Sequence, residues 1–353
     1  MRFVLTIALL IGATHAAAQP YAYVPNAGSN NVSVIDDATQ TVIATIPVGG
    51  QPWGVAVSPD GSRAYVTNRG SASVSVIDTS TNTVIATVAV GAAPIGAVVT
   101  PDGSEAYIVN SSSASVSVIE AATNTVTATI GGFSSAWYLD VMPDGSQVLV
   151  ADQSANLVRI IDTATHAIVG SYVQTNNPWH VSISPDGSKA YTSSFFAGQV
   201  GVIDLNTGTT TSVPGTASNS DAAFSADGSV VYLSRWNGGG VLVVDVATDA
   251  VVATIPTPSN RTDGVSITPD GSKLYVAGAS ANVTYIIDPA TNTITGTVPV
   301  GSTPIASGDM FAPTGFVAPI AQGVELDAVP GAPLVYAEEI NATPGAPVSL
   351  LNP

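Results

Sequence analysis

One short turn recurs along this chain at an almost constant distance, and this repetition restricts the fold more than any other feature. The turn is Pro-Asp-Gly, or in one copy Ala-Asp-Gly, and its aspartates are Asp60, Asp102, Asp144, Asp186, Asp227 and Asp270. The distances between successive aspartates are 42, 42, 42, 41 and 43 residues. A period of about 40–45 residues is typical of the blades of a β-propeller.

The unit that contains Asp60 predicts four strands joined by short turns. The apolar segment Gly54–Ser58 leads into the turn, where proline presets φ, aspartate bonds back to the backbone and glycine adopts a positive φ. Further strands are predicted at Arg63–Asn68, Ser73–Asp78 and Thr83–Val90. Hydrophobic residues make up 45% of the chain and charged residues only 9%, which suits strands that pack on both faces. Four antiparallel strands per repeat form one propeller blade.

The two ends of the repeat array complement each other. Six complete units run from about Gln51 to Val300. Before them, Tyr21–Gly49 has the second, third and fourth strands of a unit but lacks the first; after them, Ser302–Gly315 has the pattern of a lone first strand. We therefore predict an all-β fold, a seven-bladed β-propeller of four-stranded antiparallel blades over residues 19–315. The C-terminal strand completes the N-terminal blade, which removes free strand edges.

The repeat also resembles a known family. The segments AYVTN at Ala64 and AYIVN at Ala106, together with the recurring VSVID, are similar to the YVTN family of seven-bladed β-propeller repeat proteins. The resemblance covers roughly residues 20–315. It implies a secreted or cell-surface propeller, in a family whose biochemical role is often unassigned. The kinship extends to lactonase-type and quinoprotein-subunit propellers, and this fold alone does not determine a function.

The segments outside the repeat predict export and a C-terminal extension. Arg2, the apolar run Phe3–Ala13 and the small residues Ala16–Ala18 form a Sec-type signal peptide over residues 1–18. We therefore expect the protein to be secreted, periplasmic or at the cell surface. Residues 316–353 contain Pro-Gly-Ala-Pro twice and predict a Pro/Gly-rich tail or linker.

Charge and cysteine content exclude several classes of function. With 25 acidic and 8 basic residues, the formal net charge is −17. Nucleic-acid binding requires lysine and arginine to neutralise phosphates, so it is not expected. The same acidity argues against docking on an anionic membrane, and we predict no membrane insertion. The chain has no cysteine, which excludes thiol catalysis, disulfides and cysteine metal sites. An extracellular protein or glycan remains the expected partner.

One face of the predicted ring collects aromatic and basic residues. In a propeller, the loop before the first strand and the loop between the second and third strands lie on the same face. Three of the four tryptophans stand seven residues before a turn aspartate, and the fourth lies nine residues after Asp227. Arg69 and Phe195 occupy that second position in their own units. The predicted ligand-binding residues of this face are Trp53, Arg69, Trp137, Trp179, His180, Arg235, Trp236 and Arg261.

Two interpretations of these residues remain open. Tryptophan and arginine are enriched at binding hot spots, which favours a binding face. A tryptophan at a fixed repeat position also fits a role in filling the space between adjacent blades. The segment Ser234–Gly240, which contains Arg235 and Trp236, departs from the repeat consensus, and such departures are expected at functional sites.

Signals for catalysis or metal binding are weaker. Of the three histidines only His180 falls near the predicted hub, so a multi-histidine metal centre is not expected. A lone histidine is more often structural than a catalytic base. Asp152, Asp221, Asp263 and Asp309 lie near the predicted mouth, and carboxylates suit Ca²⁺ or Mg²⁺. The turn aspartates and the basic residues Arg63, Lys189 and Lys273 are interpreted as ordinary turn residues.

These patterns favour a non-enzymatic, secreted binding module. Its predicted ligand is a protein, a peptide or an envelope glycan, bound by the tryptophan- and arginine-bearing face. Two alternatives remain open: a metal-dependent lactonase or hydrolase at the hub, and a structural surface-layer or adhesion module. No cofactor is expected for the binding module, whereas Ca²⁺ or Mg²⁺ belongs to the hydrolase alternative.

Overall fold

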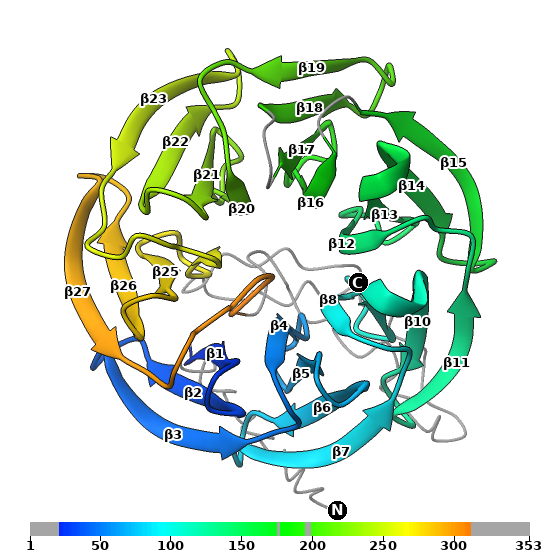
Figure 1. The fold of residues 1–353 in the computed structure, drawn as a ribbon, viewed down its shortest axis with the longest axis horizontal. Coiled ribbons are helices and arrows are strands. Elements are labelled where there is room, and N and C mark those ends of the chain that lie inside the picture. The colour runs from blue at the N-terminus through cyan, green and yellow to red at the C-terminus, as the bar shows by residue number, and fades with distance from the viewer. Residues whose placement is uncertain (1–20, 175–176, 195–198, 312–353) are drawn as a thin grey trace, which may run out of the picture. The chain divides into compact units, whose positions relative to one another are not determined.

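The computed structural model describes residues 21–174, 177–194 and 199–311. Seven β-sheets stand in a ring around a central hub (Figure 1). The predicted signal peptide (residues 1–18), the predicted tail (residues 316–353) and Phe195 lie outside the described residues. Within the described part of the chain, no helix has the length and apolar character needed to cross a membrane.

The strands follow one another blade by blade around the ring. Blades 1 to 4 consist of β1 (Tyr21–Asn26), β2 (Asn31–Asp36), β3 (Thr41–Pro47); β4 (Pro52–Val57), β5 (Arg63–Asn68), β6 (Ser73–Asp78), β7 (Thr83–Ala89); β8 (Pro94–Val99), β9 (Glu105–Asn110), β10 (Ser115–Glu120), β11 (Thr125–Ile130); and β12 (Ala136–Val141), β13 (Gln147–Asp152), β14 (Leu157–Asp162), β15 (Ala167–Val173). Blades 5 to 7 consist of β16 (Pro178–Ile183), β17 (Lys189–Ser194), β18 (Val200–Asp204), β19 (Thr210–Val213); β20 (Asn219–Phe224), β21 (Val230–Arg235), β22 (Val241–Asp245), β23 (Ala250–Ile255); and β24 (Val265–Ile267), β25 (Leu274–Gly278), β26 (Val283–Asp288), β27 (Thr293–Pro299). Two short 3₁₀ helices, η1 (Ser111–Ser113) and η2 (Gln153–Ala155), follow β9 and β13.

Within a blade, successive strands are antiparallel neighbours, with the first strand at the hub and the fourth at the rim (Figure 1). The burial pattern follows this order. The hub strand β8 is buried along its whole length, whereas the rim strand β7 alternates between exposed and partly buried residues and buries only Val88. The predicted all-β architecture of seven four-stranded blades is confirmed.

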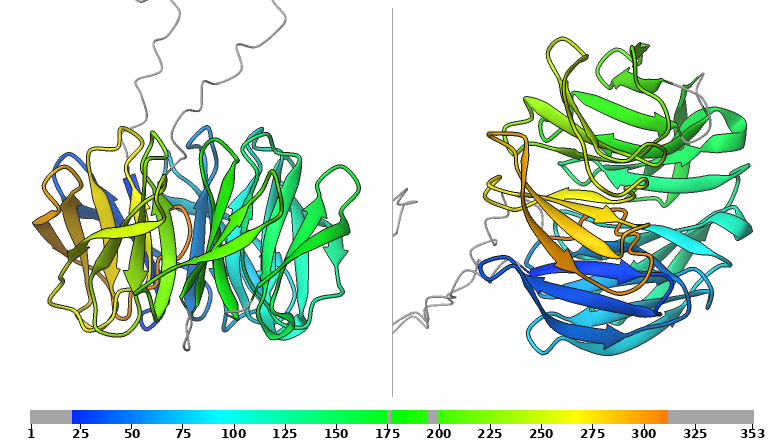
Figure 2. Two further views of the ribbon diagram at one scale, coloured as in Figure 1. Left: turned by 90° about the horizontal axis from the view of Figure 1, so that it is seen from above. Right: turned by 60° about the vertical axis from the view of Figure 1, so that its left-hand side comes forward.

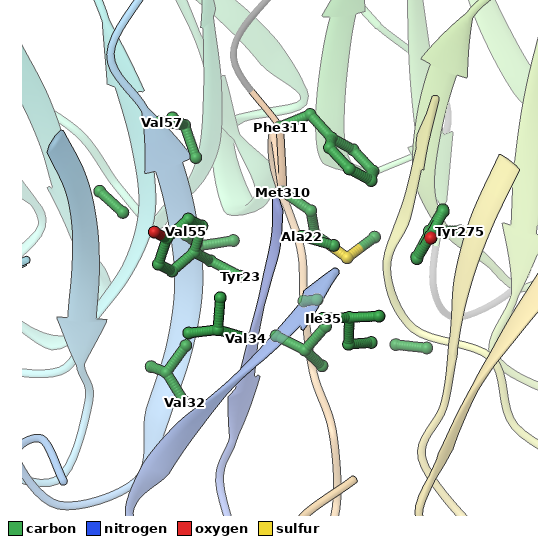
Figure 3. Close-up of a cluster of buried hydrophobic side chains, with 14 of the residues drawn as sticks. Ala22, Tyr23, Val32, Val34, Ile35, Val55, Val57, Tyr275, Met310 and Phe311 are labelled. Carbon is green, nitrogen blue, oxygen red and sulfur yellow. The ribbon is translucent and has the colours of Figure 1, made fainter. Parts of the chain in front are cut away.

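Residues from the C-terminal side close the ring. Asn26 of β1 forms a bridge with Pro304, and the backbone N–H of Tyr23 donates to the carbonyl of Met310 at 3.2 Å. Met310 and Phe311 then pack among the side chains of blade 1 and its neighbours (Figure 3). The ring of Phe311 meets Tyr275 of blade 7 edge-on, with ring centroids 4.9 Å apart. The closing segment therefore pairs with blade 1 as predicted, although it forms bridges instead of a continuous strand.

The strands run between two opposite faces of the ring (Figure 2). We call the face where the first strands begin the mouth face; there Pro52 pairs with Asn68, and Asn219 pairs with Arg235. The opposite face holds the Pro-Asp-Gly turns, and we call it the turn face. In the turn after β4, the carboxylate of Asp60 accepts the Ser58 hydroxyl and the Ser62 N–H, at 2.6 and 3.0 Å.

Basic residues of the turn face join neighbouring blades. Lys273 of blade 7 lies 2.8 Å from the carboxylate of Asp37 in blade 1, and the Tyr275 hydroxyl donates to the same carboxylate. Lys189 and Asp249 form the equivalent contact between blades 5 and 6, at 3.0 Å. The interpretation of these lysines as ordinary turn residues was therefore wrong, because each holds two blades together.

Candidate functional site

One position of the hub strands explains how a polar site is placed in the ring. The residue six positions before the turn aspartate is glycine in blades 2, 3 and 7, namely Gly54, Gly96 and Gly264. A Cβ atom on Gly54 would collide with the carbonyl oxygen of Ile95 in the next blade, so the close approach of the hub strands requires glycine there. Blades 4, 5 and 6 instead carry Tyr138, His180 and Asp221 at this position.

These three polar side chains contact one another inside the hub. His180 Nε2 lies 2.8 Å from Asp221 Oδ1, and the rings of Tyr138 and His180 are 5.0 Å apart. The Trp53 indole N–H donates to the Tyr138 hydroxyl at 2.6 Å, from blade 2 to blade 4. The exposed fractions of Tyr138, His180 and Asp221 are only 2%, 5% and 1%. Residues from four blades thus form one buried network.

The network continues from blade 6 into the adjacent blade 7. The Ser220 hydroxyl, next to Asp221, donates to the carbonyl oxygen of Asp263 at 2.8 Å. The Asp263 carboxylate forms an ion pair with Arg261 at 2.8 Å, and the Arg261 guanidinium lies 3.4 Å from the centre of the Trp236 ring. We call this set the mouth network: Trp53, Tyr138, His180, Asp221, Asp263, Arg261 and Trp236.

Further aromatic and basic side chains border the mouth network. Trp137 and Trp179 stack with ring centroids 3.8 Å apart, and the guanidinium of Arg69 lies 4.9 Å from the centre of the Trp53 ring. Trp179 is 7% exposed, whereas Trp53 and Trp137 pack against the core of blades 3 and 4 but remain partly exposed. The tryptophans therefore fill space between blades and also present part of their surface on the mouth face.

Burial and charge perturb the ionisable groups of the hub. Burial raises the pKa of Asp140 to about 7, and the charge of Asp309 adds to the effect. Burial also raises the pKa of Asp263 to about 7, although the ion pair with Arg261 opposes the shift. For His180, burial lowers the pKa, but the charge of Asp221 and its hydrogen bond outweigh this, so the net shift is upward. The hub therefore retains protons at a pH where exposed carboxyls are ionised.

A second opening of the hub lies on the turn face. Asp140 and Asp309 line a pocket of about 170 Å³ there, together with Ser182, Phe224 and Phe311. The Asp140 carboxylate accepts the backbone N–H of Ile183 at 2.7 Å. Asp140 belongs to β12, as does Tyr138, so one strand carries polar groups toward both faces of the hub.

The four aspartates predicted as metal ligands do not all converge. Asp221 and Asp263 lie in the mouth network, and Asp309 lines the opposite pocket. Asp152 instead accepts the backbone N–H groups of Ser134 and Ser135 and pairs with Arg159 at 3.2 Å. Over the described ranges, no group of three or more His, Asp or Glu side chains is arranged to hold a metal ion.

All eight predicted ligand-binding residues belong to the hub or the loops of the mouth face. Trp53, Trp137, Trp179, His180, Trp236, Arg69 and Arg261 are joined by the contacts above, and Arg235 ends β21, where its backbone exchanges hydrogen bonds with Thr262. Sequence reasoning missed Tyr138 and Asp140. The glycine row was the available signal for Tyr138, since only three blades depart from glycine there.

Comparisons with known proteins agree on the fold. A family model described as a YNCE-like beta-propeller matches residues 12–103. No curated protein matches the sequence. Hydrazine synthase from Kuenenia stuttgartiensis has a similar structure, with a TM-score of 0.67 and 23% identity over 72% of this chain and 88% of that one.

Two further solved structures resemble the ring over 82% of this chain. One is a functionally unknown protein from Desulfotomaculum acetoxidans, with a TM-score of 0.68, 17% identity and 99% of its own length covered. The other is provisionally assigned as a 6-phosphogluconolactonase from Bacteroides uniformis, with a TM-score of 0.68, 20% identity and 98% covered. At these identities the similarity concerns the fold alone. The chain is a seven-bladed β-propeller with a YNCE-like match in its N-terminal part, consistent with the YVTN type.

Proposed function

We propose that this protein is an exported binding module whose mouth face holds a protein, a peptide or an envelope glycan. One observation supports this proposal above all: side chains from five of the blades form two series of contacts in the hub, Trp53–Tyr138–His180–Asp221 and Asp263–Arg261–Trp236, which the hydrogen bond from Ser220 to the Asp263 carbonyl oxygen joins. These residues occupy positions where the repeat sequence changes between blades. The repeat pattern itself does not require these side chains, and departures from a repeat fit a role in recognition.

The chemistry of the mouth face suits recognition. Tryptophan offers a large apolar surface with one polar N–H, and arginine offers a planar donor group that stacks on aromatic rings. Arg69 over Trp53 and Arg261 over Trp236 already form such stacks. Because stacking already orders each guanidinium, ligand binding would cost less side-chain conformational entropy.

Binding assays on variants test the proposal. The wild-type protein is screened on glycan and peptide arrays, and its affinity for each hit is measured by calorimetry. We expect Trp53→Ala and Arg261→Ala each to lower affinity at least tenfold, since truncation of a hot-spot residue costs about 2 kcal/mol or more. Arg63→Ala, on the turn face, serves as the control and should bind normally. Unchanged affinity in both mouth variants, with normal thermal midpoints, would contradict the proposal.

A hydrolase that uses Ca²⁺ or Mg²⁺ at the hub is the second candidate. The carboxylates of Asp221 and Asp263 in the mouth network favour it, because carboxylates are the ligands that these cations prefer. Metal analysis of purified protein, followed by thermal unfolding with added CaCl₂ or with EDTA, separates the two candidates. The hydrolase requires bound metal and a thermal midpoint that rises with Ca²⁺; the binding module requires neither. Assembly into lattices would instead favour the surface-layer alternative.

A further inference from the structure

Most cations of this acidic chain have an oxygen partner. Lys189, Lys273, Arg159 and Arg261 each lie within 3.2 Å of an aspartate carboxylate. Arg63 donates to the carbonyl oxygen of Ala121 in the next blade. With 25 acidic residues against 8 basic ones, such pairing is the expected outcome for every cation in the chain.

Two guanidinium groups are exceptions. Among the described residues, the side chains of Arg69 and Arg235 form neither an ion pair nor a hydrogen bond. Both are partly exposed, and the Nε atom of each is buried without a partner. A buried donor without an acceptor carries a desolvation penalty, and an unpaired cation keeps its full attraction for an anion.

Both exceptions stand on the mouth face beside a tryptophan. Arg69 follows the second strand of blade 2 and stacks on Trp53, and Arg235 ends the second strand of blade 6 and precedes Trp236 in the chain. The mouth face thus holds two guanidinium groups without an oxygen partner, one stacked on the indole of Trp53 and one next in the chain to Trp236, whose ring Arg261 covers on one side.

On this basis, and resting on the proposed binding function, we infer that the ligand is an acidic oligosaccharide that bears a carboxylate on more than one sugar ring. A guanidinium binds a carboxylate through two parallel N–H···O bonds. The flat apolar face of a pyranose ring matches the adjacent indole surface. Because two unpaired guanidinium groups stand on the same face, a chain of acidic sugar rings fits them better than an isolated sugar, since binding at the first arginine raises the effective concentration at the second.

The net charge of the protein makes this recognition selective. A chain of formal charge −17 repels anions at long range, so only a ligand that engages both arginines at contact distance is retained. Long polyanions of high charge density are therefore disfavoured relative to short acidic oligosaccharides.

Titration with oligogalacturonides tests the inference. The probes are the monomer, longer oligomers and the fully methyl-esterified form of the same oligomer, which keeps the sugar rings but removes the charges. We expect the oligomers to bind more tightly than the monomer, and affinity to fall at least tenfold on esterification, since a hydrogen bond to a charged group contributes roughly ten- to hundredfold in affinity. Arg69→Ala and Arg235→Ala should each lower affinity about tenfold or more, and Arg63→Ala should not.

The outcomes separate the inference from the function on which it rests. If charged and esterified oligomers bind equally, the inference fails while the proposed function stands. If no oligogalacturonide, alginate or hyaluronan oligomer binds, but a peptide binds in a way that requires Trp53, the ligand class is wrong and the face is right. If no array hit depends on Trp53 or Arg261, the proposed function fails. Arg69→Lys provides a further check, because it keeps the charge and loses the two-bond geometry, so its affinity should lie between that of wild type and that of Arg69→Ala.

Discussion

At the scale of single residues, His180 and Asp221 form an ion pair that is almost completely buried. Both side chains lie inside the hub, at the position where blades 2, 3 and 7 have glycine, and they are 2.8 Å apart. Removing two charged groups from water is costly, and their mutual attraction compensates only when the geometry is good and both partners remain. Substitution of either partner leaves an unpaired buried charge.

We therefore predict that His180→Ala destabilises the protein by about 3 kcal/mol or more. His166→Ala is the matched control, because His166 also pairs with an acid, Glu105, but both side chains are about a quarter exposed. The control should lose under about 1 kcal/mol, as expected for a pair near the surface. Urea unfolding at pH 6 measures both. Equal losses of unfolding free energy in the two variants would show that the buried pair stabilises the protein no more than the exposed pair does.

At this scale, the sequence predicted on which face of the ring a residue lies, but it did not predict which side chains contact each other. The tryptophan row placed Trp53, Trp137 and Trp179 on the mouth face because their distance from the turn is constant. The contact of Tyr138 with Trp53, 85 positions earlier, depends on the three-dimensional ring and has no local sequence signal. Asp152 was predicted as a metal ligand, but its carboxylate accepts the backbone N–H of Ser135 and pairs with Arg159.

At the scale of elements, the blade could be predicted almost completely. The predicted segments Arg63–Asn68 and Ser73–Asp78 coincide with β5 and β6, because Pro-Asp-Gly and Thr-rich turns define both ends of each strand by local chemistry. The closing segment was predicted to complete blade 1, and Asn26 does pair with Pro304. That its pairing is irregular could not be predicted, because it depends on how closely the segment approaches Val55 and Gly54 of blade 2.

The closing segment predicts a specific loss of stability. Met310 is fully buried where blade 1 meets its neighbours, whereas Met142 is only partly buried on the turn face. Met310→Ala should cost about 2–5 kcal/mol through lost burial and a cavity. Met142→Ala removes the same atoms from a less buried site, so it should cost clearly less. Chemical unfolding of both variants is the measurement. A loss for Met310→Ala no larger than that for Met142→Ala would mean that the closing segment does not hold the ring together.

At the scale of the whole molecule, the turn aspartates and the hub aspartates contribute to folding stability with opposite dependence on pH. The turn aspartates accept short hydrogen bonds from serine and threonine hydroxyls and from backbone N–H groups, and the pKa of Asp227 is lowered to about 2 by these bonds. Their stabilisation is present above their ordinary pKa and is lost only in strong acid. The hub aspartates behave in the opposite way, because burial favours their neutral form.

The sign of the hub contribution follows from the raised pKa values. Asp140 and Asp263 have pKa values near 7 in the folded protein, against an ordinary value of 3.8. A group of this kind contributes stability that is present below its ordinary pKa and is lost as pH rises through the folded pKa. His180, whose pKa is raised by Asp221, loses its contribution in the same direction once pH passes its folded pKa. The growing negative charge of the chain adds repulsion to this loss.

We therefore predict that the protein is most stable near pH 4, just above the ordinary pKa of an aspartate, and that its thermal midpoint falls as pH rises from about 4 to 8. Asp140→Asn keeps the shape of the side chain and removes the titrating group, so its thermal midpoint should fall less over the same range. Asp144→Asn, in an exposed turn where the pKa is lowered, should leave the slope between pH 6 and 8 unchanged. Scanning calorimetry from pH 4 to pH 8 on the three proteins is the measurement. A midpoint that rises between pH 6 and 8, or identical slopes for wild type and Asp140→Asn, would contradict the prediction. Either result would mean that the hub carboxyls are ionised in the folded protein.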